Sequence, residues 1–258
     1  RTKGQPMASR LNKLLADNRK AAARKFEVLA KQGGDEAEIF LYDAIVSSQE
    51  EADWYGGVAP EAFVKAVRGI DAGTIHLRIN SPGGSVFAAR AMEQALREHK
   101  ARIVVHIDGI AASAATFIAM AGDEIVMNKG AMFMIHKAWT WTAGNADDLA
   151  KEAGLLAKID GTLAQTYADR TGKDVETING WMADETWFTA DEAVEYGFAD
   201  KLAETEARAE WNLSAYAHAP AMPAARRDDP VPDPDPETTL SDDHRARQMQ
   251  RVQIAARL

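Results

Sequence analysis

The chain has 258 residues, a formal net charge of −9 at pH 7, and 46% hydrophobic and 27% charged residues, which is typical of a soluble globular protein with a sizeable core. It contains no cysteine, which excludes disulfides, thiolate metal sites and a cysteine nucleophile. No apolar run approaches the ~20 residues of a membrane helix, and the charged first 30 residues lack the apolar core of a secretory signal, so a cytoplasmic protein without membrane contact is expected.

Basic residues are concentrated near the N-terminus. Residues 1–31 hold nine Lys or Arg and two acidic residues, a net charge of +7, so the rest of the chain carries −16. An acidic body argues against nucleic-acid binding. The basic segment could contact an acidic partner, or it could be a solvated helix or a disordered arm.

The apolar spacing of residues 8–31 predicts a helix that ends at Gly33-Gly34. Strands and helices are then predicted to alternate, which favours an α/β domain. The predicted strands are 37–44, 74–79, 102–107, 124–127, 131–136, 186–189 and 198–202. The predicted helices are 60–70, 86–99, one from about 112, 145–170, 174–182 and 190–196.

The composition changes after residue 203. Six of the nine prolines fall within residues 218–237, with four aspartates among them, which is typical of a linker without a core. We therefore divide the chain into a basic helical extension (1–35), an α/β domain (36–203), and an acidic Pro-rich linker with a helical tail (204–258). Both extensions are expected to be flexible or to bind a partner.

Three motifs together suggest an acyl-transfer site. Ser113 is flanked by alanines where a predicted strand gives way to a helix, so the Ala114 N–H could face an oxyanion. Upstream, Gly83 and Gly84 follow a strand and permit the close backbone approach that a second oxyanion donor needs. His136 ends a later strand and is the usual type of base for a serine nucleophile.

The sequence resembles the Clp protease proteolytic subunit family over about residues 38–203. The resemblance rests on four motifs in order, which are Ile79-Asn80-Ser81-Pro82-Gly83-Gly84, Gly109-Ile110-Ala111-Ala112-Ser113, Met134-Ile135-His136 and Ala190-Asp191-Glu192-Ala193-Val194-Glu195-Tyr196-Gly197. It is most similar to the phage-encoded branch, whose members are associated with head maturation. The family's fold is a ClpP/crotonase-like spiral of ββα units with a protruding handle helix, here 145–170.

The resemblance implies a serine endopeptidase with Ser113 as nucleophile and His136 as base. It makes Gly84 and Ala114 the oxyanion-hole donors. The family's aspartate position holds Glu185 here, and Asp184 beside it is the alternative acid.

Partners follow from the same resemblance. It implies a polypeptide substrate, a homo-oligomer of heptameric rings, and either a capsid or scaffold protein or an AAA+ unfoldase as partner. No metal or cofactor is expected.

Other readings stay open from the sequence. A crotonase-type acyl-CoA enzyme would share the fold and the oxyanion donors without needing the serine and histidine, and a catalytically idle ring protein would keep only the assembly. A Ser-Lys dyad with Lys129 or Lys137 is conceivable. Trp139 and Trp141 could line a substrate groove or pack in a core or an interface.

Overall fold

The computed structural model describes residues 18, 25–30, 35–140, 142–206 and 211–220, and these belong to one compact unit around an eight-stranded sheet. The strand order is β1-β2-β3-β4-β5-β8, with β6 pairing beside β4 and β7 beside β6. The strands are β1 (Lys25–Ala30), β2 (Glu36–Tyr42), β3 (Thr74–Ser81), β4 (Arg102–Ala112), β5 (Glu124–Lys129), β6 (Met132–Ile135), β7 (Thr186–Thr189) and β8 (Lys201–Glu206). The helices are α2 (Gln49–Tyr55), α3 (Pro60–Arg68), α4 (Val86–Arg97), α5 (Ala114–Ala119), α6 (Ala146–Thr171), α7 (Val175–Ala183) and α8 (Ala190–Glu195).

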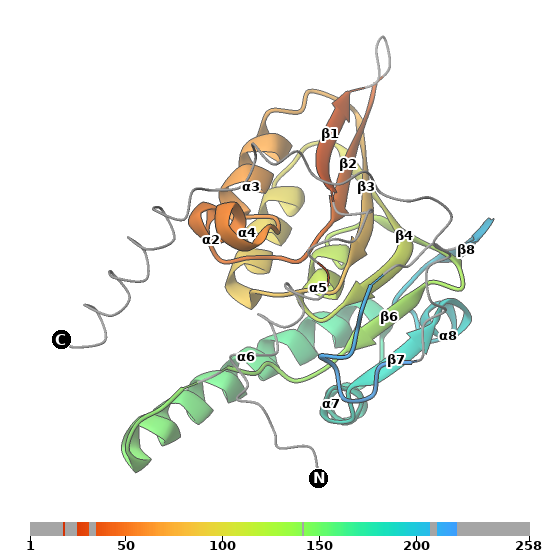
Figure 1. Ribbon diagram of the computed structural model, residues 1–258. Helices are drawn as coiled ribbons and strands as arrows, with labels where there is room; N and C mark the ends of the chain where they lie inside the picture. Colours follow the sequence, from red (N-terminus) through yellow and green to blue (C-terminus); the bar gives the residue numbers. More distant parts are fainter. Residues whose placement is uncertain (1–17, 19–24, 31–34, 141, 207–210, 221–258) are drawn as a thin grey trace, which may run out of the picture. The chain divides into compact units, whose positions relative to one another are not determined.

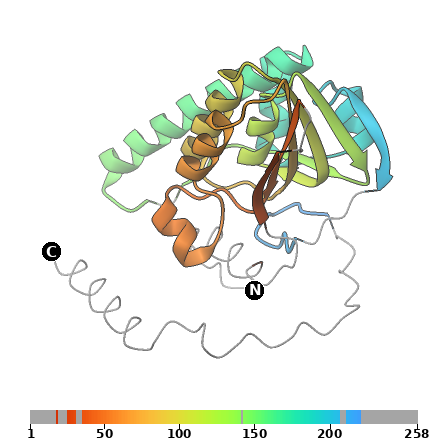
Figure 2. The same cartoon turned by 90° about the horizontal axis from the view of Figure 1, so that it is seen from above.

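Helices α3, α4 and α5 cover one face of the sheet (Figures 1 and 2). Alternate residues of β3, namely Ile75, Leu77 and Ile79, are fully buried, as are Phe63 of α3 and Phe117 of α5. Fully burying each such side chain contributes about 1.5–3 kcal/mol. This strip of apolar side chains therefore holds the helical layer on the sheet.

The opposite face of the same strands is polar. His76 and Arg78 occupy the alternate positions of β3, and His106 and Asp108 of β4 lie beside them. All four are at least partly shielded from solvent and are joined by hydrogen bonds. Period-two alternation thus gives one strand an apolar face and a polar face.

Parallel pairing brings three strand ends together. Strand β3 pairs in parallel with β4, and β4 pairs in parallel with β5 and β6. The carboxyl ends of β3, β4 and β6 therefore meet at one edge of the sheet. In open α/β sheets this edge is where ligands bind.

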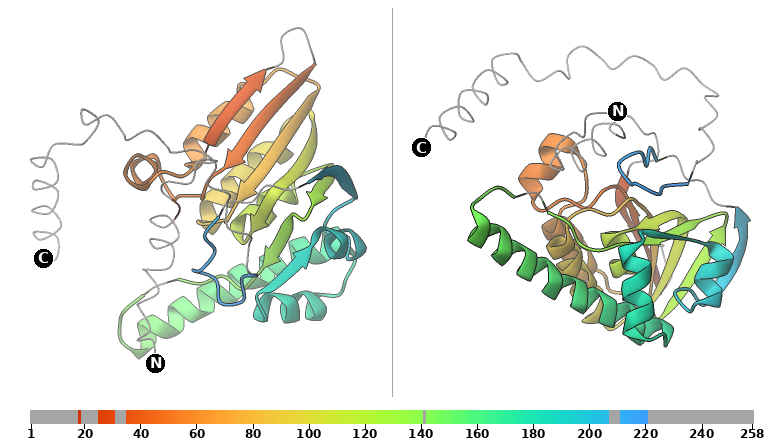
Figure 3. Two further views of the ribbon diagram at one scale, coloured as in Figure 1. Left: turned by 45° about the vertical axis from the view of Figure 1, so that its right-hand side comes forward. Right: turned by 90° about the horizontal axis from the view of Figure 1, so that it is seen from below.

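Helix α6 extends beyond the sheet (Figure 3). A capping box between Asn145 and Asp148 starts it, and Gly172 ends it in the left-handed conformation, with φ +70°. Its buried residues are all in the second half, whereas Leu149 and Leu155 in the first half are exposed. The first half thus presents apolar side chains that the described residues do not cover.

The α/β fold expected from the resemblance is confirmed, and most predicted elements lie within a few residues of their observed places. The predicted helix over residues 8–31 is wrong for Lys25–Ala30, which form β1 antiparallel to β2. Phe26 and Val28 pack against the core from this strand, since backbone pairing with β2 overrides a weak helical spacing. Residues 8–17, 19–24 and 31 of that predicted helix lie outside the described residues, as does the predicted tail from residue 221.

Two further differences concern the ends of the domain. Helix α2 was not predicted, and the last strand begins at Lys201 instead of near Phe198. Residues 211–220, assigned from sequence to the linker, pack within the same compact unit as the sheet. Of the helices in the described part of the chain, none is long and apolar enough to cross a membrane.

Candidate active site

Ser113 lies in a strained turn between β4 and α5. Its backbone has φ +55° and ψ −125°, a combination that costs a non-glycine residue about 1–3 kcal/mol. The Ser113 N–H donates to the Met134 carbonyl (2.9 Å), and the Ser113 carbonyl accepts from Thr116 N–H (3.0 Å) and from its hydroxyl (2.5 Å). These bonds hold the serine in a sharp strand-to-helix turn, a geometry that exposes nucleophilic hydroxyls in other hydrolases.

The buried Tyr167 of α6 stabilises this turn through Thr116. The Thr116 hydroxyl is also hydrogen-bonded to the Tyr167 hydroxyl at 2.7 Å, deep in the core. Burial raises the pKa of Tyr167 to about 12, so its phenol is neutral at physiological pH and remains a hydrogen-bond donor. Helix α6 thereby helps to fix the position of Ser113.

His136 is the first residue after β6 and reaches Ser113. Because Ala112 pairs with Met134 in the parallel ladder, the chain past each strand end emerges at the same edge of the sheet. The His136 Nε2 atom lies 2.7 Å from Ser113 Oγ, within hydrogen-bond distance. With its proton on Nδ1, the imidazole would accept the serine proton at Nε2, the arrangement that a general base requires.

The backbone of Gly83 and Gly84 passes tightly beside the serine. Both glycines have positive φ, +88° and +146°, which side-chain-bearing residues rarely adopt. A Cβ on Gly83 would lie 2.8 Å from Ser113 Cβ and 2.9 Å from Ala114 N, and one on Gly84 would overlap the Ile45 carbonyl. The structure thus brings the Gly83-Gly84 turn against the start of α5, where the first amides have no acceptor within the helix.

Glu185 lies in the turn between α7 and β7, beside the histidine. Ile135 and Thr186 form the last pair of the antiparallel β6–β7 ladder, so His136 and Glu185 leave the ladder at the same end. Glu185 is half-buried with φ +50°, whereas Asp184 is exposed. The Glu185 carboxylate accepts a 2.7 Å hydrogen bond from the backbone N–H of His218. The register therefore favours Glu185 over Asp184 as the acid, and its role stays a prediction.

A small apolar pocket opens beside the serine and histidine. Its free space is only about 10 Å³, roughly the room that one water molecule needs. Its lining consists of Ser113, His136 and the apolar or aromatic residues Val86, Ala89, Ala114, Phe117, Ala138, Leu163 and Tyr167. A substrate side chain entering it would be held next to the nucleophile.

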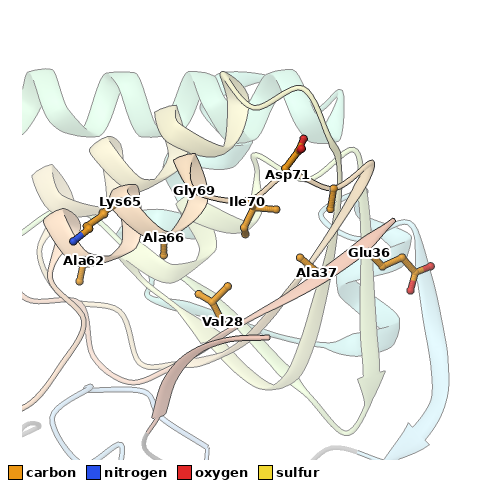
Figure 4. A pocket seen from close by; sticks show the side chains of 10 residues that line it. Val28, Glu36, Ala37, Ala62, Lys65, Ala66, Gly69, Ile70 and Asp71 are labelled. Atoms are coloured by element: carbon orange, nitrogen blue, oxygen red, sulfur yellow. The ribbon is translucent and has the colours of Figure 1, made fainter. Parts of the chain in front are cut away.

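A second pocket lies away from this site, between the β1–β2 ribbon and α3 (Figure 4). Alanines, Val28 and Ile70 form much of its wall. It contains neither Ser113 nor His136, so it does not contribute to the arrangement described above. No group of three or more His, Cys, Asp or Glu side chains is arranged for a metal ion in the described residues.

The other residues that the sequence singled out take no part in the Ser113–His136 hydrogen bond. Lys129 and Lys137 are exposed, and the hydroxyl of Ser113 is instead bonded to a histidine, which disfavours a Ser-Lys dyad. Trp139 is half-buried, and Trp141 lies outside the described residues.

One aromatic residue at the site escaped sequence reasoning. Tyr216 lies over His136, with ring centroids 5.8 Å apart and an angle of 78° between the planes. Its hydroxyl donates to the Pro82 carbonyl and lies near the Ser113 side chain. The available signal was the apolar trio Trp211, Leu213 and Tyr216 in an otherwise polar region.

Comparison with known proteins gives a consistent picture of the domain. Residues 65–206 match the protein family described as Clp protease. The ATP-dependent Clp protease proteolytic subunit of Streptococcus gordonii (strain Challis) is 36% identical over 132 residues, which cover 50% of this chain and 67% of the relative. The subunit of the same name from Streptococcus pneumoniae (strain Hungary19A-6) is 34% identical with the same coverage. The matched range contains Ser113, His136 and Glu185 and ends before residue 211.

Proposed function

The chain belongs to the Clp protease family of serine peptidases, and we propose that it is an endopeptidase whose nucleophile is Ser113 and whose general base is His136. The observation that carries the proposal is the 2.7 Å hydrogen bond between Ser113 Oγ and His136 Nε2 beside an apolar pocket. Neither a crotonase-type acyl-CoA enzyme nor an idle ring protein would need this pair.

The proposed reaction has two halves. The Ser113 oxygen attacks the peptide carbonyl carbon while His136 Nε2 takes the hydroxyl proton, and His136 then returns this proton to the departing amine nitrogen. Water, deprotonated by His136, hydrolyses the resulting ester and restores Ser113. Both halves pass through a tetrahedral oxyanion.

We assign the oxyanion hole to the backbone N–H groups of Gly84 and Ala114. The tight approach of the Gly83-Gly84 turn to Ala114 N supports this assignment. One such donor is typically worth about 3 kcal/mol of transition-state stabilisation. Glu185 would act as the positioning acid that holds the imidazole in the tautomer with its proton on Nδ1.

The pocket beside the nucleophile would set specificity. Val86, Phe117 and Leu163 give it an apolar wall, and a substrate side chain would widen this narrow space as it enters. We therefore expect cleavage after apolar residues. Each methylene buried there adds roughly 0.8 kcal/mol of binding, so a charged side chain at this position would be disfavoured.

We propose that the active form is a homo-oligomeric ring, heptameric as the resemblance implies, with rings stacking through α6. The exposed Leu149 and Leu155 on the projecting half of this helix support a role in contact between copies. The AAA+ unfoldase, the capsid or scaffold partner, the phage origin and the cytoplasmic location stay predictions from the resemblance, as does the division into extensions and a central domain.

The decisive test is active-site labelling with a fluorophosphonate, combined with hydrolysis of a fluorogenic peptide that has leucine before the scissile bond. Wild-type protein should label and cleave, and Ser113→Ala should abolish both while leaving the circular dichroism spectrum unchanged. His136→Ala should lower kcat/KM by about 10⁴-fold or more. A Ser113→Ala protein that cleaves as fast as the wild type would refute the proposal.

A further inference from the structure

Residues 211–220, which we name the strap, run along the catalytic edge of the sheet (blue in Figure 1). Trp211 and Leu213 are buried, at 5% and 4% exposure, whereas Ala217 is exposed. The strap lies beyond residues 65–206, which match the protease family. It is therefore a part of this chain that the family likeness does not explain.

The first half of the strap packs on the strands that carry the catalytic pair. Trp211 and Leu213 form one apolar cluster with Ile110 and Ala112 of β4 and with Met134 of β6. These strand residues come just before Ser113 and His136 in the sequence. Apolar contact thus holds the strap against the support of both catalytic residues.

The same tryptophan also fastens the strap to the turn that leads to the oxyanion-hole glycines. Its Nε1–H lies 3.2 Å from the Asn80 carbonyl and 3.1 Å from Asn80 Oδ1, a shared hydrogen bond in a buried place. Asn80 is itself only 2% exposed. Losing this donor would leave a buried polar group unpaired, at a cost of about 1–3 kcal/mol.

Tyr216 in the second half of the strap lies beside the catalytic pair. Its hydroxyl donates to the carbonyl of Pro82, in the turn before the oxyanion-hole glycines, and lies near the Ser113 side chain. Its ring lies edge-on between His136 and Trp187, with both centroid distances 5.8 Å. Burial raises the pKa of this phenol, so it stays protonated and keeps its donor at neutral pH.

His218 connects the strap to the acidic turn. Its backbone N–H donates to Glu185 Oε1 at 2.7 Å, and its Nδ1 lies 2.8 Å from the Asp184 carbonyl. The strap thus lies near the serine, contacts the histidine ring and is bonded to the proposed acid. A substrate carbonyl must approach Ser113 Oγ to about 3 Å, and the Tyr216 side chain lies beside that path.

We propose that the strap is an autoinhibitory segment that keeps the active site latent until a polypeptide substrate displaces it. The inference rests on the proposed serine-peptidase function. In this state Tyr216, packed against His136, would obstruct the approach to Ser113, and the amide of His218 occupies one oxygen of the Glu185 carboxylate that would orient His136. The apparent affinity for substrate then equals the intrinsic affinity multiplied by the fraction of molecules in which the strap is released.

The test measures the rate at which a fluorophosphonate labels Ser113 in the full chain. Tyr216→Phe removes the hydroxyl and keeps the ring. Trp211→Ala loosens the strap at a residue in the Asn80 and β4–β6 contacts, without altering Tyr216. We expect both variants to label about tenfold faster than wild type, the factor that a 1.4 kcal/mol weaker strap gives. The control Ala217→Ser, at an exposed strap position, should label at the wild-type rate.

The outcomes separate this inference from the function on which it rests. Equal labelling of wild type and both variants, or slower labelling of the variants, overturns the autoinhibitory strap and leaves the peptidase proposal standing. Labelling of neither wild type nor folded variants refutes the peptidase proposal, and the inference falls with it. Circular dichroism and thermal unfolding of each variant confirm that the rates refer to folded protein.

Discussion

Two polar clusters lie on neighbouring strands of one sheet, and they differ in how fully their groups are satisfied. On the face away from the helices, Asp108 accepts from Arg78 Nε and Nη2 at 2.8 and 2.6 Å and from the Tyr42 hydroxyl at 2.5 Å. At the carboxyl edge, Ser113 sits on strained backbone beside a pocket, within reach of a base.

The difference distinguishes a structural cluster from a reactive one. In the first, a bidentate ion pair fixes both charges. In the second, small residues and positive φ angles hold the Ser113 hydroxyl next to the His136 imidazole. The strained backbone costs free energy, which the packing of the surrounding core offsets. Variants of the carboxyl edge should therefore change activity, and variants of the opposite face should change stability.

The sharpest test of this division is the acid behind the histidine. Glu185→Gln keeps the size of the side chain but removes the charge that would stabilise imidazolium, so kcat should fall about 10³-fold with little change in KM. The free energy of unfolding should change little. Peptide hydrolysis and urea denaturation measure the two quantities.

Asp184→Asn is the matched control for this acid. Asp184 is exposed, and the contact that joins it to the strap uses its backbone carbonyl, so kcat should stay within about threefold of wild type. A loss in Asp184→Asn equal to that in Glu185→Gln would show that the register argument chose the wrong acid.

The opposite face should respond in the other way. Asp108→Asn removes the bidentate partner of the half-buried Arg78 and leaves only Glu38, at 3.8 Å, as an acidic neighbour, so we expect the free energy of unfolding to fall by about 2–3 kcal/mol. Activity per folded molecule should stay within about threefold of wild type. Urea unfolding and active-site titration provide the two readings.

Asp71→Asn controls for charge removal, because its ion pair with Lys100 is fully exposed to solvent. This variant should leave the free energy of unfolding unchanged.

The tyrosine of the same cluster gives a second measurement. Burial and the hydrogen bond to Asp108 raise the pKa of Tyr42 to about 12. That pKa should fall in Asp108→Asn, and an unchanged tyrosine titration would contradict the described network.

The smallest expected effect concerns pH and the histidine pair of the same face. His106 Nε2 lies 3.0 Å from His76 Nδ1, and burial, followed by the charge of Arg78, lowers the pKa of His106. The folded state thus binds fewer protons than the unfolded chain just below pH 6.5. This histidine therefore leaves the free energy of unfolding undiminished above that pH and lowers it as the pH falls toward the lowered pKa.

Unfolding at pH 7.5 and 5.0 checks this sign. The wild type should be less stable at pH 5.0, and the loss should be smaller in His106→Gln. An identical pH dependence in the two proteins would assign the acid sensitivity to other groups.

Short-range patterns in the sequence determined much of this molecule. The Asn80–Gly84 turn, Ser113 among alanines and His136 after an apolar strand are local signals, since turn chemistry, small residues and strand alternation are set by neighbours along the chain. The α/β fold and the pairing of nucleophile with base followed from those signals and from their likeness to a known family. The sequence could not choose between Glu185 and Asp184.

The tertiary structure decided what depends on distant partners. Lys25–Ala30 form a strand because β2 offers a backbone ladder, and no local propensity encodes that ladder. The register of β6 and β7 makes His136 and Glu185 leave the ladder at the same end. Tyr216 lies against His136 because Trp211 and Leu213 pack on an apolar surface of β4 and β6. Such contacts arise between segments far apart in sequence, where burial and pairing energies outweigh local preference.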